Sequence, residues 1–166
     1  MNPTGYWISE KLDGVRCILT TNGTLLSRNG KRFNPPGWFM ESMPRGVRLD
    51  GELWTQRGDF DGLVSAIQRK VNPWENVTLQ VFDLAALDMP IESRHAALAR
   101  LHLPPWVRLL PHRRCRSQDD LDAEEESVVR GGGEGLCLRA PGSFYRPGNF
   151  IKVKRLHRDL NRSILD

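Results

Sequence analysis

Apolar and polar residues alternate in several short stretches of the chain, and a period of two residues predicts β-strands. The clearest stretch is 47–54, where every second side chain is apolar or a glycine. In a strand with this phase, the two carboxylates of Asp50 and Glu52 would lie on the same face, opposite the apolar one. This strand would therefore present a pair of acidic groups on one side of a sheet.

Other short apolar stretches end at turn residues and are also expected to be strands. They are residues 6–10, 15–20, 24–28, 77–84, 106–110, 134–139 and 150–153. Asn22-Gly23 lies between the second and third of these and indicates a hairpin, and Asn29-Gly30 indicates a further turn after Arg28.

Three stretches have the spacing of helices instead. They are residues 60–71, 91–101 and 117–129. Ser117 is a suitable N-cap for the last helix, and the glycine run 131–133 would end it. We expect Arg94 and Arg100 to lie on the solvent side of the second helix, and the acidic run 124–126 to form a solvated face of the third.

Strands and hairpins are interleaved with a few helices, without regular alternation of the two. This order predicts an α+β fold, with mainly antiparallel sheets and flanking helices. A length of 166 residues, with 39% hydrophobic and 27% charged residues, suits one globular domain, which we place at residues 1–154.

Charge and cysteine content narrow the function classes slightly. A net charge of +4 and a pI near 9.2 favour a polyanionic partner such as nucleic acid. The three cysteines show no metal-ligand or disulfide spacing, so reduced thiols in a cytoplasmic protein are expected. From the sequence we expect neither a signal peptide nor a membrane-spanning stretch.

The stretch 10–16, Glu-Lys-Leu-Asp-Gly-Val-Arg, is the strongest candidate for chemistry. Lys11 could act as a nucleophile if its amine were neutral, and the Asp13-Gly14 turn would leave room for a bulky substrate. Arg16 would add a rigid fork of hydrogen-bond donors.

Further short motifs follow in a fixed order along the chain. They are Lys11-Leu12-Asp13-Gly14-Val15-Arg16, Ser27-Arg28-Asn29-Gly30, Leu49-Asp50-Gly51-Glu52-Leu53-Trp54, Val81-Phe82-Asp83-Leu84, Glu134-Gly135 and Ile151-Lys152-Val153-Lys154. This ordered set closely resembles the adenylation domain of ATP-dependent DNA ligases, most of all the minimal ligases of bacteria and their viruses. The resemblance covers nearly the whole chain and implies a covalent nucleotidyltransferase, ATP-grasp-like domain.

The resemblance also implies a nucleotide site that binds ATP. Lys11 would attack the α-phosphate of ATP, release pyrophosphate and carry AMP through a phosphoramide bond. The other residues expected to hold the nucleotide are Glu10, Arg16, Glu52, Phe82, Lys152 and Lys154. Among them, Arg16 and Glu52 would bind the ribose hydroxyls and Phe82 would stack on adenine, while the two lysines would neutralise phosphate charge.

Metal and DNA sites are implied in the same way. Glu134, with Glu52 or Asp50, would hold Mg²⁺, or Mn²⁺ in its place, since hard cations prefer carboxylate oxygens. A nicked duplex DNA would be the polymer substrate, with an arginine contacting its 5′-phosphate. The residues expected at DNA phosphates are Arg28, Lys31, Arg32 and Arg146.

Two departures from the family pattern stand out. The chain has Asn149 where the minimal ligases carry an arginine after Tyr-x-x-Gly, so Arg146 is the candidate replacement at that phosphate. The family normally continues into an OB-fold domain, so we expect residues 155–166 to begin a hinge or linker to such a domain in the full-length protein, which we expect to be a monomer.

Rival functions remain open at this point. RNA ligases and mRNA-capping guanylyltransferases resemble the set around Lys11, although stretch 49–54 favours a DNA ligase. An NAD-dependent ligase is disfavoured because only ten residues precede Lys11. A catalytically silent module that only binds nicks would use the basic hairpin and leave Lys11 without a role.

Overall fold

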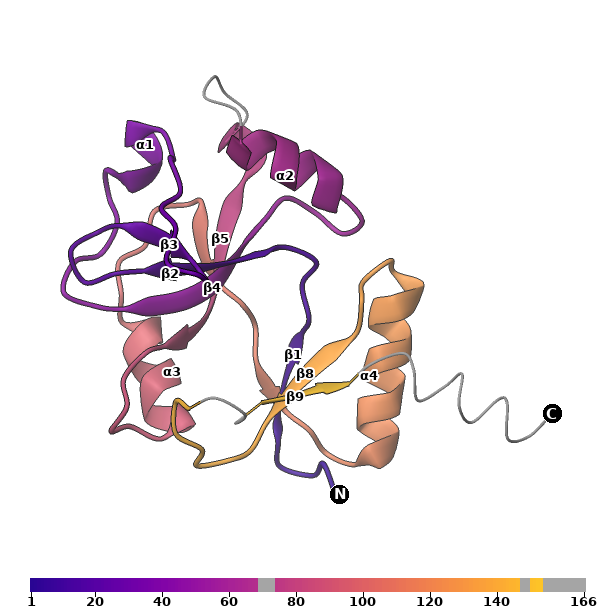
Figure 1. Ribbon diagram of the computed structural model, residues 1–166. Helices are drawn as coiled ribbons and strands as arrows, with labels where there is room; N and C mark the ends of the chain where they lie inside the picture. The colour runs from indigo at the N-terminus through magenta and orange to yellow at the C-terminus, as the bar shows by residue number, and fades with distance from the viewer. Residues whose placement is uncertain (69–73, 147–149, 154–166) are drawn as a thin grey trace.

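The computed structural model describes residues 1–68, 74–146 and 150–153. Two β-sheets, each with its own helices, lie side by side and the chain passes between them several times (Figure 1). Within the described residues, no helix combines the length and the apolar character needed to cross a membrane.

The larger sheet has five strands in the order β3-β2-β4-β5-β6. Their bounds are β2 Val15–Leu19, β3 Leu25–Ser27, β4 Leu49–Trp54, β5 Thr78–Leu84 and β6 Val107–Leu109. Among the described strands only β5 and β6 pair in parallel, and all other pairs are antiparallel. The expectation of mainly antiparallel sheets is therefore confirmed.

The smaller sheet has four strands in the order β7-β1-β8-β9. Their bounds are β1 Trp7–Glu10, β7 Arg113–Arg114, β8 Leu136–Arg139 and β9 Phe150–Val153. The first strand of the chain thus lies between two strands from its second half, which brings the stretch before Lys11 next to the stretch after Gly135.

Helices cover the two sheets separately (Figure 1). Helices α1 Gly37–Met40, α2 Phe60–Gln68 and α3 Ile91–Ala99, with the 3₁₀ turn Trp74–Asn76, belong to the larger sheet, and α4 Gln118–Arg130 covers the smaller one. The larger core contains Phe39, Leu63 and Trp74, while the smaller contains Ile8 and Leu138. Each sheet therefore has an apolar core of its own.

Turn and cap residues act as their types predict. Gly23 has a φ of 83° in the turn between β2 and β3, and Gly30 has a φ of 80° in the next turn. The side chain of Ser117 accepts a hydrogen bond from the Asp120 N–H at the start of α4. Both turns and this cap were predicted from the sequence.

Two sequence predictions about surface residues are wrong. Arg94 was placed on the solvent side of α3, but its side chain is 1% exposed and bonded to Asp83, and only Arg100 is exposed. In the acidic run of α4, Glu125 is 7% exposed and faces the smaller sheet rather than solvent. Helical spacing shows which side chains share a face, but it does not show which polar residue finds a buried partner.

Candidate functional site

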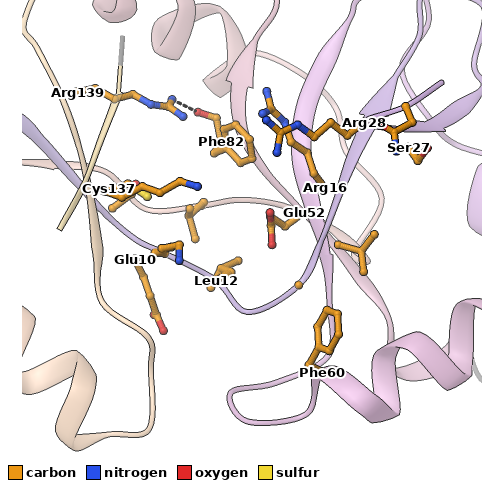
Figure 2. A pocket seen from close by; sticks show the side chains of 17 residues that line it. Glu10, Leu12, Arg16, Ser27, Arg28, Glu52, Phe60, Phe82, Cys137 and Arg139 are labelled. Carbon is orange, nitrogen blue, oxygen red and sulfur yellow. Dashed lines mark hydrogen bonds between the residues drawn. The ribbon is translucent and has the colours of Figure 1, made fainter. Parts of the chain in front are cut away.

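A cavity of about 500 Å³ opens at the boundary between the two sheets. Its lining includes residues from both: Ser9, Glu10, Lys11, Leu12, Gly14, Val15, Arg16, Ser27, Arg28, Asn29, Glu52, Phe60, Phe82, Leu110, Cys137, Arg139 and Lys152. Figure 2 shows Glu52 and Phe82 on one side of this space and Cys137 and Arg139 on the other. The cavity therefore unites residues that are far apart in the sequence.

Lys11 lies directly after β1 at this boundary. Its backbone N–H donates to the Gly135 carbonyl at 2.9 Å, which extends the pairing of β1 with β8 by one residue. Its Nζ lies 2.9 Å from Glu134 Oε2, and the two side chains are 30% and 41% exposed. The predicted nucleophile is thus held by backbone and side-chain contacts to the same glycine-flanked segment.

Gly14 allows the chain to turn tightly after Lys11. A Cβ atom at this position would lie 2.3 Å from the Leu53 carbonyl oxygen and 2.8 Å from Glu52 Oε2. Any side chain would therefore force β2 away from β4, so the sequence needs glycine here to keep Lys11 and Glu52 in one cavity.

Arg16 and Glu52 are directly paired residues on β2 and β4, so their side chains share a face, and both line the cavity. Arg16 is anchored by Asp50, with Nε donating to Oδ1 at 3.0 Å and a second bond to Oδ2. The Tyr145 hydroxyl also donates to Asp50 Oδ2, at 2.7 Å. Asp50 is fully buried, and it is not among the residues that line the cavity.

Glu52 is the most perturbed acid of the site. Its Oε2 is buried and has no hydrogen-bond partner among the described residues. Burial raises the pKa of Glu52 to about 7, and the charges of Glu134 and Asp50 add to the rise, although a Gly14 backbone hydrogen bond and Arg16 oppose it. A buried acceptor without a partner is costly, so this oxygen is available to a ligand.

Phe82 occupies an irregular position in β5. The register between β4 and β5 shifts between Asp50 and Gly51, and Phe82 has no directly paired residue. Such bulges redirect side chains, and here the Phe82 ring lines the cavity. Arg139 donates to the Phe82 carbonyl at 2.9 Å, and its guanidinium lies 5.0 Å from the ring centroid (Figure 2).

A buried network stands behind Phe82. Asp83 accepts from Arg94 Nε at 2.8 Å and from Arg139 Nη1 at 3.2 Å. These three residues come from β5, α3 and β8, so the network joins the two sheets. Burial lowers the pKa of Arg139, and Asp83 opposes that change.

The Glu10 carboxylate points away from Arg16 and Glu52, as Figure 2 shows. It accepts two hydrogen bonds from Arg57, at 2.8 and 3.0 Å. Glu10 was predicted to contact the nucleotide, but both of its carboxylate oxygens are already bound by Arg57.

Of the two lysines predicted in the last strand, the structure describes Lys152. Lys152 pairs with Cys137 in the sheet and lines the cavity. Lys154 lies outside the described residues, as does Asn149.

Of the residues expected at DNA phosphates, Arg28 lines the cavity, and all four are exposed. Lys31 and Arg32 follow Arg28 around the turn at Gly30, so three basic residues lie along one hairpin. Arg146 lies on the loop after β8, with its guanidinium 5.6 Å from the Phe144 ring centroid.

Two of the three acids predicted as metal ligands remain candidates for that role. Within the described ranges, no group of three or more His, Cys, Asp or Glu residues is arranged to hold a metal ion. Glu52 and Glu134 are the two predicted acids near Lys11, whereas both oxygens of Asp50 are engaged by Arg16 and Tyr145.

Sequence reasoning missed several residues of the site. Phe60, Cys137 and Arg139 line the cavity, and Tyr145 reaches Asp50 from outside it. Arg139 could have been suspected, because an arginine at the end of an apolar strand needs a partner. Phe60 carried no such signal, since the pattern indicated only a helix.

Comparisons with known proteins show what the chain as a whole is similar to. No family model matches the chain. A DNA ligase of Haemophilus influenzae is 32% identical over 158 residues, which are 90% of this chain and 58% of that protein. DNA ligase 4 of Neurospora crassa is 30% identical over 197 residues, covering 90% of this chain and 19% of that protein.

Solved structures give the same result for the fold. A Lig E DNA ligase matches with a TM-score of 0.85 and 32% identity, covering 93% of this chain and 64% of that one. A Chlorella virus DNA ligase–adenylate matches with a TM-score of 0.74 at 21% identity, covering 91% and 61% of the two chains, which supports the fold alone.

The chain spans about three fifths of the length of the bacterial relative and of the Lig E structure. Over nine tenths of its own length it matches them in sequence, and it matches the Lig E structure in fold as well. The resemblance expected from the ordered motifs is therefore confirmed, and the chain is similar to DNA ligases in sequence and fold.

Proposed function

We propose that this chain is the catalytic adenylyltransferase domain of an ATP-dependent DNA ligase. It forms a lysyl-AMP at Lys11 and transfers AMP to the 5′-phosphate of nicked DNA, after which the 3′-hydroxyl attacks and releases AMP. The observation that carries the proposal is the position of Lys11, 2.9 Å from Glu134 at a cavity that unites those predicted nucleotide residues that the structure describes.

The chemistry of the cavity supports a nucleotide as its ligand. A volume of about 500 Å³ lies in the usual range for small-molecule sites, and the lining is largely apolar with a few convergent polar groups. Phe82 offers a ring for adenine, Arg16 and Glu52 offer a donor and an acceptor for the ribose, and Lys152 offers a cation for phosphate.

The buried contacts of Asp50 suggest a changed role for that residue. Its two oxygens bind Arg16 and Tyr145, so we assign it to the orientation of Arg16 rather than to metal binding. A bidentate carboxylate limits the rotation of a guanidinium and so prepares it to donate to a ribose hydroxyl.

A divalent cation fits Glu52 and Glu134. The unpartnered buried oxygen of Glu52, and the way Glu134 raises its pKa, are the features that a cation between or near the two acids would relieve. Mg²⁺ suits this oxygen-only pair and, when bound, would neutralise phosphate charge. Lys11, Arg16 and Lys152 would position the phosphates and ribose around it.

The DNA side of the proposal relies on exposed basic residues. Arg28, Lys31 and Arg32 follow one hairpin beside the cavity, where phosphates of a nick would meet Lys11-bound AMP. The Lig E ligases are described as binding DNA with a minimal scaffold. The ATP-grasp-like class, the linker at residues 155–166, a following OB-fold domain, a monomeric state and a cytoplasmic location are part of the same proposal.

The first test is the mass of the intact protein before and after incubation with ATP and Mg²⁺. Wild type, first stripped with pyrophosphate, should gain the mass of one AMP, and Lys11→Ala should gain none because the nucleophile is absent. Lys31→Ala is the matched control, since it removes an exposed lysine outside the cavity lining and should still gain AMP.

Three results would overturn parts of this proposal. Mass gain from GTP in place of ATP would favour a capping-type enzyme, and transfer of AMP to nicked RNA in preference to nicked DNA would favour an RNA ligase. No mass gain by wild type, even with an OB-fold domain of a related ligase added, would leave the silent nick-binding module as the better explanation.

A further inference from the structure

Arg57 connects three separate parts of the molecule next to the site. It lies between β4 and α2, on a segment that faces the loop between α4 and β8 (Figure 1). Its Nε and Nη2 donate to the two oxygens of Glu10 at 2.8 and 3.0 Å, and its Nη1 donates to the Gly131 carbonyl at 3.3 Å. One guanidinium from the larger sheet thus binds a strand end and a helix end of the smaller sheet.

The glycines after α4 fit closely around this contact. A Cβ atom at Gly131 would lie 2.4 Å from Arg57 Nη1, and one at Gly133 would lie 2.8 Å from Glu10 Oε1. The Gly133 N–H donates to the Val128 carbonyl at 2.8 Å, so an outward movement of the loop would break this hydrogen bond. The glycine run therefore does more than end a helix, because it lets Arg57 and Glu10 approach the backbone.

Both bound segments continue directly into the reacting pair. Glu10 precedes Lys11, and Gly133 precedes Glu134. The Lys11 N–H also donates to the Gly135 carbonyl, so the two segments are joined on both sides of the Lys11–Glu134 ion pair. A shift of either segment would change the position of the amine relative to the cavity.

We propose that Arg57, through Glu10 and Gly131, is a positioning residue that holds Lys11 and Glu134 in register for attack on the nucleotide. This inference rests on the proposed adenylyl transfer, and it adds a residue that has no contact with the nucleotide in the roles assigned above. Misplacing a nucleophile by a fraction of its working distance lowers the rate of the chemical step without weakening ground-state binding to the same extent.

The competing explanation is an ordinary surface ion pair, and the chain offers a matched control for it. Arg113 binds Asp120 with two hydrogen bonds, at 2.8 and 3.0 Å. The side chains of that pair are 38% and 20% exposed, against 37% and 22% for Arg57 and Glu10. Arg113 also lies 3.5 Å from Glu124 Oε2, but neither of its acidic partners adjoins Lys11 or Glu134 in the chain.

The kinetic experiment compares Arg57→Ala with Arg113→Ala in the full chain. For Arg57→Ala, the rate of AMP uptake at saturating ATP should fall by about tenfold or more, while the KM for ATP stays within about twofold of wild type. Arg113→Ala should change neither by more than about twofold. Equal rates for the two variants would overturn the inference.

A double-mutant cycle tests whether Arg57 acts through Glu10. If the pair works as one unit, Glu10→Gln with Arg57→Ala should lose little more rate than Arg57→Ala alone, because the contact is already absent. Losses that multiply would show that Arg57 acts by another route. Arg57→Lys keeps the charge but not the fork, and should recover only part of the rate.

Amide hydrogen exchange separates this inference from the proposed function. Arg57→Ala should speed exchange at the Lys11 and Gly133 amides and leave the Leu121 amide of α4 unchanged, whether or not AMP is taken up. If wild type takes up no AMP, adenylyl transfer is contradicted, even where the exchange data confirm that Arg57 holds the two segments. Unchanged exchange at Lys11 and Gly133 would overturn the positioning role of Arg57 even where adenylyl transfer is confirmed.

Discussion

The two sides of the cavity are held in place by different kinds of contact. On the larger sheet, Arg16 is fixed by the fully buried Asp50, and Phe82 is backed by the buried Asp83 network. On the smaller sheet, Lys11 is held by Glu134 through side chains that are 30% and 41% exposed. The acids behind Arg16 and Phe82 are thus buried, whereas both members of the Lys11–Glu134 pair are partly exposed.

This difference suits the two tasks that the site would have. Groups that only bind a nucleotide gain from fixed geometry, because no reorganisation is then needed at the moment of reaction. A nucleophile must exchange an ion pair for a bond to phosphorus, so a partner that holds it weakly is an advantage. The comparison predicts that stability depends mainly on the buried side and chemistry mainly on the exposed one.

The largest effect on stability is expected from the buried network. Arg94→Ala should lower the free energy of unfolding by about 3 kcal/mol, because among the described residues it leaves the buried Asp83 with Arg139 as its one ionic partner. Urea denaturation would measure this, with Arg100→Ala as the control, since Arg100 is an exposed residue at the end of the same helix. A loss no greater than that of the control would contradict the assigned role of the network.

A smaller effect, which depends on pH, is expected from the half-buried His112. Burial lowers the pKa of His112 to about 3, and its ring packs against His95, whose pKa is also lowered by burial. The unfolded chain then binds more protons than the folded one below the ordinary histidine pKa of about 6.5. Stability contributed by His112 is therefore complete above that pH and is lost as pH falls.

Between pH 7 and pH 5 this loss should be about 2 kcal/mol for His112. His112→Gln should show a correspondingly flatter dependence of unfolding free energy on pH. His102→Gln, at an exposed position, is the control and should keep the wild-type slope. If both variants keep that slope, His112 does not contribute to the pH dependence of stability.

The smallest change in stability, with a clear loss of activity, is expected on the exposed side. Glu134→Gln should alter the free energy of unfolding by less than about 0.5 kcal/mol, because the Lys11–Glu134 pair is partly exposed and screened by solvent. The same variant should take up AMP more slowly than wild type in the mass assay. A variant with normal uptake but a large loss of stability would reverse the comparison between the two sides.

Much of the site could be predicted because its residues occur in short ordered motifs. Five residues expected at the nucleotide and one expected at a DNA phosphate all line one cavity: Lys11, Arg16, Glu52, Phe82 and Lys152, and Arg28. The hairpin turns at Gly23 and Gly30 and the Ser117 cap were also predictable, since each depends on neighbours within a few residues.

The errors and omissions concern contacts between distant segments. Arg94 and Glu125 were assigned to solvent because a helical period alone does not show which polar side chains the fold buries. The contacts of Arg57 with Glu10 and of Tyr145 with Asp50 were not predicted, because the partners lie 47 and 95 residues apart in the sequence. Asp50 and Glu52 were correctly placed on one face. Only the fold shows that Asp50 is fully buried against Arg16, whereas Glu52 lines the cavity.

The sequence by itself thus determined the chemistry that is available: a lysine beside a tight turn, acids in phase on one strand, and a basic hairpin. These features follow from residue type and local spacing, which obey short-range rules. Only the tertiary structure decided that Asp50 is buried behind Arg16, while Glu52 keeps an oxygen without a partner among the described residues. It also decided that Arg57 binds Glu10, at the end of the strand that leads to Lys11. Burial and long-range pairing depend on how the two sheets meet, and a single stretch of sequence does not contain that information.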